Sequence, residues 1–444
     1  MRNPPLQGKR VVILGLARQG IALARYLSGV GARVVISDMQ PAEKLAANIA
    51  ALNDLPIEYV LGGHPSMLLE GADLLCLSGG VAADLPLAQE ARRRGVPLSN
   101  DSQIFLEACP AGVTVVGITG SAGKTTTTTL VGKMLSVESG AWRVEGNAPP
   151  STLHSTWVGG NIGNPLIADV GRMRAGDVVV MELSSFQLEI MTRSPHVAAL
   201  LNLTPNHLDR HGTMEAYTAA KSHILLHQTA SDVAVLGLDD AGSRGLAPLA
   251  KGRLAYFSDE QSVDEGAFLR NEQIVFRWGG GERMVCPVSE IKLRGRHNVL
   301  NALAACAISG AVGAEPAAMR AAIGGFTGVE HRLEFVRERA GVQWYKDSIA
   351  SAPERVIAAL KSFDEPIVLL AGGRDKKLPW DEFARLARQR VKFLVLFGEA
   401  GPLIQRALEA AGMEPERFTR VGPLAEAIKV AAERAGTGDV VEAV

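Results

Sequence analysis

The stretch at residues 117–126, GITGSAGKTT, has the residue types that bind a nucleotide phosphate. It follows an apolar run of strand type and precedes a helical pattern, so backbone N–H groups and a helix N-terminus can surround phosphate oxygens. Lys124 is expected to reach the terminal phosphates, and the Thr125 hydroxyl to ligate Mg²⁺. Position 118 is Ile where the general phosphate-loop pattern has Gly, so a plain strand-to-helix turn is the alternative. The candidate ATP-binding residues here are Gly120, Ser121, Ala122, Gly123, Lys124, Thr125 and Thr126.

Two further positions could complete a metal site beside this loop. Glu182 follows the apolar run DVVVM, so its carboxylate is expected at the carboxyl end of a buried strand, where a second oxygen ligand for Mg²⁺ is needed. His207 follows another predicted strand, and His211 competes with it for the same role. The alternatives are a surface glutamate at a strand end and a structural histidine.

Lys221 is predicted to lie on the apolar face of its helix, because Tyr217, Ile224 and Leu225 stand at the i−4, i+3 and i+4 positions. A lysine there can pack its stem and extend its ammonium to water. It can instead be a buried amine with altered chemistry that faces the metal site. The sequence leaves both interpretations open.

The elements that must position these residues form three segments in which strands and helices alternate. This alternation predicts an α/β protein with parallel sheets and three domains, at 1–110, 111–328 and 329–444. Residues 139–155 contain two prolines and little periodicity, which predicts an exposed insertion. The predicted strands are 10–14, 33–37, 73–77, 113–118, 177–181, 197–203, 233–238, 254–257, 343–346, 367–370, 393–397 and 439–441. The predicted helices are 20–27, 214–228, 299–312, 353–360, 381–390, 403–411 and 424–435.

Length and composition exclude several classes of protein. The 444 residues suit about three domains, and 46 Lys and Arg against 47 Asp and Glu leave no charge that favours nucleic acid or an anionic membrane surface. No apolar run approaches the ~18 residues of a spanning helix, and no signal peptide is evident, so we expect the protein in the cytoplasm. We also expect it to be a monomer. The four scattered cysteines form no CxxC pair, which argues against a zinc knuckle or a redox dithiol: Cys76, Cys109, Cys286 and Cys306.

Eight motifs occur in the order and spacing of the Mur ligases, the ATP-dependent amide ligases of peptidoglycan precursor synthesis. The chain resembles this family from residue 11 to about residue 441. Its ELSSFQLE motif is similar to the form used by the members that add D-glutamate. The motifs are TGSAGKTT, GGNIGNPL, ELSSFQLE, LNLTPNHLDRH, AYTAAKSHIL, GRHNVLNALAA, FTGVEHRLE and YKDSIAS.

The resemblance implies a Rossmann-like first domain that binds the UDP-sugar, a central P-loop domain that binds ATP, and a Rossmann-like third domain that binds ATP and the amino acid. ATP phosphorylates the carboxylate of UDP-N-acetylmuramoyl-L-alanine, and the amine of D-glutamate then attacks the acyl phosphate. The resemblance implies two Mg²⁺ ions, and it matches Lys221 to a lysine that carries a CO₂-derived carbamate. The implied metal ligands are Thr125, Glu182, His207 and carbamylated Lys221, and the implied catalytic residues are Lys124, Glu182, His207 and Lys221.

The remaining implied contacts are spread over all three domains. NAD is not expected in the first one, because the stretch from Gly15 to Gly20 lacks the middle glycine of the dinucleotide fingerprint. The implied nucleotide contacts outside the loop are Asn298, Arg332 and Asp347. The implied substrate contacts are Arg18, Gln19, Asp38, Ser78 and Gly80 at the uridine diphosphate, Asn161 and Ser184 at the muramoyl-alanine part, and Ser351 and Lys376 at the amino acid.

The chain departs from the family pattern at two places. DSIASAP replaces DSKATN, so Ile349 supplies no cation and Ala352 no amide. The sequence stops at Val444, before the family's glutamate-binding loop, so the third domain is expected to be truncated. Two other functions therefore stay open. One is a ligase similar to folylpolyglutamate synthase, and the other is a non-catalytic homologue that only binds the nucleotide sugar.

Overall fold

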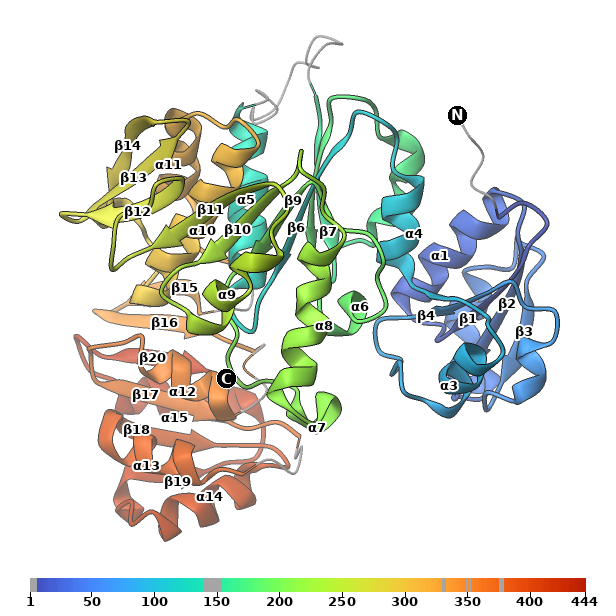
Figure 1. Ribbon diagram of the computed structural model, residues 1–444. Helices are drawn as coiled ribbons and strands as arrows, with labels where there is room; N and C mark the ends of the chain where they lie inside the picture. The colour runs from blue at the N-terminus through green and yellow to red at the C-terminus, as the bar shows by residue number, and fades with distance from the viewer. Residues whose placement is uncertain (1–5, 139–153, 330–332, 349, 351–352, 375–378) are drawn as a thin grey trace, which may run out of the picture. The chain divides into compact units, whose positions relative to one another are not determined.

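The computed structural model describes residues 6–138, 154–329, 333–348, 350, 353–374 and 379–444. They contain three β-sheets, coloured from blue through green to red in Figure 1. The chain divides into two compact units, one of Met1–Glu290 with Val299–Gly324 and one of Ile291–Asn298 with Gly325–Val444. The first unit holds the first two sheets, and the second holds the third. Within the described residues, no helix is both long enough and apolar enough to cross a membrane.

The first sheet has five parallel strands in the order β3-β2-β1-β4-β5. The strand order reverses between β1 and β4, and ligands of such sheets bind beyond the carboxyl ends of the strands at that point. Its strands are β1 (Arg10–Leu14), β2 (Arg33–Asp38), β3 (Glu58–Leu61), β4 (Leu74–Leu77) and β5 (Leu98–Ser99). Its helices are α1 (Arg18–Gly29), α2 (Ala46–Ala50), α3 (Pro86–Arg93) and α4 (Asp101–Ala108).

The second sheet has nine strands in the order β14-β13-β12-β11-β10-β9-β6-β8-β7, and only the β12–β13 and β13–β14 pairs within it are antiparallel. The buried run TVVGIT of β6 lies between β9 and β8 and leads into the glycine-rich loop. Its strands are β6 (Thr114–Thr119), β7 (Thr156–Gly160), β8 (Val178–Glu182), β9 (Val197–Leu200), β10 (Val233–Gly237), β11 (Arg253–Ser258), β12 (Gly266–Arg270), β13 (Gln273–Trp278) and β14 (Gly281–Pro287). The helices that follow are α5 (Lys124–Glu138), α6 (Ser185–Leu188), α7 (Leu208–His211), α8 (Met214–Leu226), α9 (Ala241–Gly245), α10 (Arg296–Ala311) and α11 (Pro316–Gly325).

The third sheet has six strands in the order β15-β16-β20-β17-β18-β19, and only its β15–β16 pair is antiparallel. The last strand of the described chain, β20, is inserted between β16 and β17. The strands are β15 (Glu334–Arg339), β16 (Val342–Lys346), β17 (Ile367–Ala371), β18 (Val391–Leu396), β19 (Phe418–Arg420) and β20 (Val440–Ala443). The helices are α12 (Pro353–Leu360), α13 (Asp381–Arg390), α14 (Gly401–Ala410) and α15 (Leu424–Arg434).

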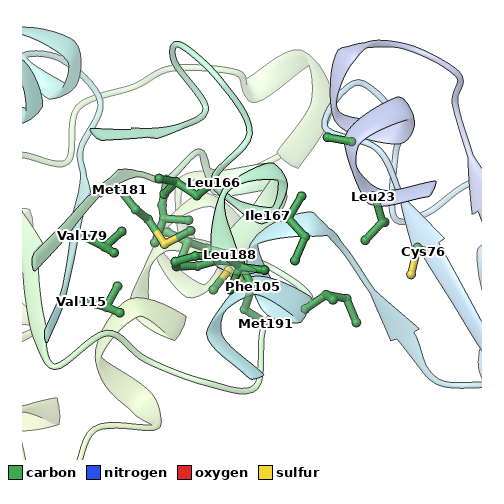
Figure 2. Packing of buried hydrophobic residues seen from close by; sticks show 14 of the residues in the cluster. Leu23, Cys76, Phe105, Val115, Leu166, Ile167, Val179, Met181, Leu188 and Met191 are labelled. Carbon is green, nitrogen blue, oxygen red and sulfur yellow. The ribbon is translucent and has the colours of Figure 1, made fainter. Parts of the chain in front are cut away.

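Apolar and polar contacts join the first two sheets. One buried apolar cluster contains side chains from both, and Figure 2 shows part of it around Phe105 of α4 and Ile167. Beside it, Asn100 Nδ2 donates to the carbonyl oxygen of Gln187 at 2.8 Å, and Gln187 Nε2 donates to Ser102 Oγ at 2.8 Å. These bonds fix the start of α4 against the short helix α6, which follows the end of β8.

The predicted elements are confirmed, with small shifts at their ends. The predicted strand 197–203 stops at Leu200. The Leu201 N–H makes the last ladder bond, to the Thr119 carbonyl oxygen, and the next residue, Asn202, instead accepts the Ser121 N–H of the glycine-rich loop. The strands that the sequence missed are short or lie toward sheet edges: β3, β5, β7, β12, β13, β14, β15 and β19. Of the predicted insertion at 139–155, residues 139–153 lie outside the described residues.

One ionisable group lies in the core of the third sheet. Glu442 on β20 is 0% exposed, and neither of its carboxylate oxygens has a hydrogen-bond partner within the described part of the chain. Burial, with Asp347 as the smaller cause, raises the pKa of Glu442 well above its ordinary value. A carboxyl with a raised folded-state pKa loses stability as the pH rises from its unfolded pKa toward its folded one.

Replacing Glu442 with Leu should therefore stabilise the second unit, by about 1–3 kcal/mol at pH 8 and by less at pH 5. Thermal unfolding at both pH values measures this difference. Glu433 is exposed on α15, so the control Glu433→Leu should shift the midpoint equally at both pH values. A Glu442→Leu protein that is no more stable than wild type at pH 8 would show that the buried Glu442 carboxylate does not destabilise the fold.

Candidate active site

The register of three parallel strands brings Glu182 to the glycine-rich loop. Glu182 is the last residue of β8, and it is paired with Ile118 of β6 on one side and with Gly160 of β7 on the other. The loop that follows β6 and the turn that follows β7 therefore start beside the Glu182 carboxylate. This is the carboxyl edge of the sheet, as the sequence predicts for this residue.

Glu182 is 2% exposed, and its carboxylate accepts hydrogen bonds from the loop after β6 and from the turn after β7. Thr125 Oγ1 donates to Glu182 Oε2 at 2.8 Å, and Asn161 Nδ2 donates to Oε1 at 2.9 Å. The backbone N–H of Asn161 also donates to the carbonyl oxygen of Glu182 at 2.9 Å. A hydroxyl and a carboxylate so close together are the hard oxygen donors that suit Mg²⁺, so this pair fits one ion.

The glycine-rich loop is held by residues that follow β9. The N–H groups of Ser121 and Ala122 donate to the backbone and side-chain oxygens of Asn202, at 3.0 and 2.8 Å. Lys124, the first residue of α5, turns its Nζ back to the Gly120 carbonyl oxygen at 2.8 Å. Thr126 follows in the first turn of the same helix. The predicted loop residues thus form one strand-to-helix turn with the lysine folded over it.

Gly123 is required by the shape of this turn. Its φ of +81° lies in the left-handed region, and a Cβ there would overlap Asn301 Oδ1. Asn301 lies on α10 and also approaches Thr127 Oγ1, at 3.4 Å. Helix α10 therefore packs directly on the start of α5, and no larger residue fits at position 123.

Lys221 is buried, which agrees with the prediction of a buried amine on the apolar face of its helix. It is 1% exposed on α8, and its Nζ donates to Thr119 Oγ1 and to the Gly120 carbonyl oxygen, each at 3.0 Å. Burial and, to a smaller extent, the nearby Lys124 ammonium lower the pKa of Lys221 well below its ordinary value, and Glu182 opposes them. The amine does not extend to water, so the solvent-exposed interpretation is wrong.

The two candidate histidines flank one phenylalanine that follows Glu182 in the chain. His207 has a left-handed backbone with φ 54° at the start of α7, and its ring meets Phe186 edge-on at 5.1 Å. The His211 ring is stacked on the Phe186 ring, with their centroids 5.2 Å apart. His211 Nε2 lies 3.0 Å from Ser185 Oγ. Within the described residues no group of three or more His, Cys, Asp or Glu side chains is arranged to hold a metal ion. The metal role of His207 stays a prediction.

Ser184 is part of a helix cap. Its Oγ donates to Gln187 Oε1 at 2.9 Å and accepts the Gln187 N–H at 3.2 Å, which makes a capping box at the start of α6. Ser184 stands two residues after Glu182, between the end of β8 and the start of α6. Its contact with substrate stays a prediction.

The predicted uridine-site residues meet at the carboxyl edge of the first sheet. Arg18 and Gln19 open α1, whose N-cap residue provides no side-chain cap. Gln19 Oε1 accepts the N–H of Gly79 at 2.8 Å. Gly79 lies between Ser78 and Gly80 in the turn after β4. The uncapped helix start therefore lies at the β1–β4 reversal, where an anion is stabilised.

Asp38 clamps the two neighbouring turns of this edge. Its Oδ2 accepts the Leu16 N–H and its Oδ1 accepts the Gln40 N–H, each at 2.8 Å. The carboxylate thus holds the turn after β1 beside the end of β2.

The other predicted site residues belong to the second unit. Asn298 Nδ2 donates to the carbonyl oxygen of Arg294 at 2.7 Å, and the N–H of buried Asp347 donates to the Ala443 carbonyl oxygen at 2.8 Å. The predicted residues Arg332, Ser351 and Lys376, and the departures Ile349 and Ala352, lie outside the described residues.

Sequence analysis missed two residues that hold the site together. Asn202 binds two N–H groups of the loop, and the Thr119 hydroxyl accepts from Lys221 while it donates to the Leu183 carbonyl oxygen at 2.8 Å. The only signal was their position, since each follows directly from an apolar strand run at the same sheet edge.

Comparison with known proteins identifies the family to which this site belongs. Three family models match consecutive parts of the chain: the Mur ligase MurD-like N-terminal domain at 9–100, the Mur ligase middle domain at 118–309, and the Mur ligase glutamate ligase domain at 331–443. A protein of Symbiobacterium thermophilum named UDP-N-acetylmuramoylalanine–D-glutamate ligase is 42% identical over 437 residues, which cover 98% of this chain and 92% of that protein. The chain belongs to the Mur ligase family.

Further relatives of this Mur ligase agree. A protein of Acetivibrio thermocellus with the same name is 39% identical over 442 residues, 98% of this chain and 91% of that protein. The UDP-N-acetylmuramate–alanine ligase MurC of Thermotoga maritima has a TM-score of 0.58 and 22% identity, and covers 98% of this chain and 95% of its own. MurF ligase of Thermotoga maritima, solved with ADP, has a TM-score of 0.55 and 18% identity, and the match covers 99% of this chain and 94% of that one. The predicted fold class, α/β with three domains, is confirmed.

Gly123→Ala should lower the affinity of this Mur ligase for ATP at least about tenfold, because the left-handed backbone and the overlap with Asn301 shift the loop. Isothermal titration calorimetry with ATP measures the change. Gly171→Ala is the control, since a Cβ there meets nothing within 4 Å. Equal ATP affinities for Gly123→Ala and wild type would show that this loop does not bind the phosphates.

Proposed function

We propose that this Mur ligase joins D-glutamate to UDP-N-acetylmuramoyl-L-alanine and converts ATP to ADP and phosphate. The observation that carries the proposal is the identity of 42% and 39% over 98% of the chain to proteins named for that reaction. The MurD-like N-terminal match at 9–100 does not favour the folylpolyglutamate synthase alternative. The buried carboxylate, hydroxyl and amine beside the glycine-rich loop supply the chemistry that such a ligase needs.

The reaction has two steps. A carboxylate oxygen of the muramoyl-alanine attacks the γ-phosphorus, the bond from that phosphorus to the β–γ bridging oxygen breaks, and ADP leaves. The amine of D-glutamate then attacks the acyl carbon and loses a proton, and the tetrahedral intermediate expels phosphate with the oxygen that came from the substrate carboxylate. Charge stabilisation and positioning supply most of the rate enhancement in reactions of this kind.

The residues of the first unit divide this work. The loop N–H groups and the Lys124 ammonium would bind the phosphates, which carry most of the negative charge. Thr125, Glu182 and His207 would hold Mg²⁺, and the Thr125–Glu182 distance of 2.8 Å supports the first two. Two bound Mg²⁺ would neutralise charge on the phosphoryl oxygens.

Lys221 would become the remaining metal ligand after carbamylation. Its burial lowers the pKa of the amine, which favours the neutral form, and only a neutral amine attacks CO₂. The N–C bond forms as a proton leaves the nitrogen, and the product is an anionic carbamate. An anion fits this position better than an ammonium, because Lys124 is a cationic neighbour.

The substrate contacts and the domain boundaries complete the proposal. Residues 1–110 would bind the UDP-sugar, 111–328 ATP, and 329–444 the amino acid and ATP. The uncapped start of α1 supports a diphosphate at the first sheet. The proposed contacts at the uridine diphosphate are Arg18, Gln19, Asp38, Ser78 and Gly80. The proposed contacts at the muramoyl-alanine part are Asn161 and Ser184. Ser351 and Lys376 would contact the amino acid. Asn298, Arg332 and Asp347 would contact ATP.

Phosphate release tests the proposed reaction. The protein is incubated with ATP, Mg²⁺, UDP-N-acetylmuramoyl-L-alanine and D-glutamate, and each substrate is omitted in turn. Release that requires both substrates, with formation of the UDP-linked dipeptide, is the expected result. Tight binding of the UDP-sugar with no release would support the binding-only alternative, and turnover of a folate with L-glutamate would replace the proposal.

Lys221→Ala should lose at least about a hundredfold in turnover, and high bicarbonate should not restore it. With isotopically labelled bicarbonate, wild type should show a carbamate carbon signal by NMR that Lys221→Ala lacks. Lys251→Ala removes an exposed lysine of the same unit and is the control. Full activity of Lys221→Ala would refute the carbamate role.

A further inference from the structure

His64 lies at the carboxyl edge of the first sheet, outside the proposed contacts of the uridine diphosphate. It follows β3 directly after two glycines, and the N–H groups of Gly62 and Gly63 donate to the Asp38 carbonyl oxygen at 2.9 and 3.1 Å. These bonds fasten the turn after β3 to the end of β2. His64 is therefore held beside Asp38, on the same edge as the uncapped start of α1.

Hydrogen bonding fixes which imidazole nitrogen carries the proton. Ser37 is 0% exposed, and its hydroxyl donates its one hydrogen to the Gly63 carbonyl oxygen at 2.9 Å. The same Ser37 Oγ lies 2.8 Å from His64 Nδ1, so Nδ1 must be the donor to Oγ. In the neutral ring Nε2 then has a lone pair and accepts. Burial lowers the pKa of His64, although Asp38 opposes this, which favours that neutral ring.

The strand order places this acceptor away from the diphosphate. The helix start that suits an anion lies at the β1–β4 reversal, and β2 and β3 follow β1 outward on the other side. Neighbouring strands are about 4.8 Å apart, so the end of β3 is about 10 Å from the end of β1. This is the reach from a diphosphate across a ribose to its base. The turn after β3 that carries His64 is thus at the nucleoside end of the site.

We propose that His64 Nε2 accepts the N3–H of the uracil base and thereby selects uracil over cytosine. Uracil carries a hydrogen on N3, whereas cytosine has a lone pair there, so two acceptors would face each other in a cytidine nucleotide. The Ser37 hydroxyl acts as a positioning group, because it sets the tautomer and the ring orientation. This inference rests on the proposed function, which supplies the uridine nucleotide.

Calorimetric titration of the full chain with UDP and CDP tests the selection. Wild type should bind UDP at least about tenfold more tightly than CDP, and in His64→Leu this ratio should fall to about one. His227→Leu, which removes an exposed histidine of α8's C-terminal end, should keep the wild-type ratio. ATP affinity should be equal in all three proteins, which shows that the variants are folded.

A methylated ligand tests the same contact without a variant. N3-methyl-UDP has no N3–H, so wild type should bind it at least about tenfold more weakly than UDP, and His64→Leu should bind the two equally. A His64→Leu protein that keeps the wild-type UDP to CDP ratio, or a wild type that binds UDP and N3-methyl-UDP equally, would overturn the inference alone. A wild type that binds no UDP-N-acetylmuramoyl-L-alanine would overturn the proposed function itself.

Discussion

The arrangement of the central site depends on one buried carboxylate. A charge that is 2% exposed is stable only when it is paired and hydrogen-bonded, and Glu182 meets this condition through Thr125 on one side and Asn161 on the other. Because Glu182 ends β8, these bonds tie the first turn of α5 and the turn after β7 to the end of that strand. The glycine-rich loop, the proposed metal donors and the predicted muramoyl-alanine contact are thereby held at one edge of the sheet.

The buried amine of Lys221 completes the electrostatics of that edge. Burial and the Lys124 ammonium lower the pKa of Lys221, and the Glu182 carboxylate opposes them with a smaller effect. The amine is held in place by Thr119 and Gly120. The proposed carbamate would place an anionic group at this buried position, beside the Lys124 ammonium.

Strand ends were predictable from the sequence, and the groups that orient side chains were not. Glu182 and the glycine-rich loop each follow a long apolar run, and a parallel sheet brings the ends of such runs to one edge. Asn202 carries no pattern of its own, because its bonds to the loop depend on which strands become neighbours. Ser184 and Gln187 have the spacing of a capping box, which predicts a helix start but not a substrate contact. The same limit applies to β15, whose exposed residues show no apolar alternation, and to His64, whose tautomer follows from a bond to a buried serine.

In the proposed reaction, the edge around Glu182 supports transfer of phosphate to a carboxylate before an amide forms. Isotopically labelled oxygen in the alanyl carboxylate of UDP-N-acetylmuramoyl-L-alanine tests this most directly. After turnover with ATP and D-glutamate, mass spectrometry of the released phosphate should show one labelled oxygen for each amide formed. Released phosphate without the label would contradict the account, because the carboxylate would then never have been bonded to phosphorus.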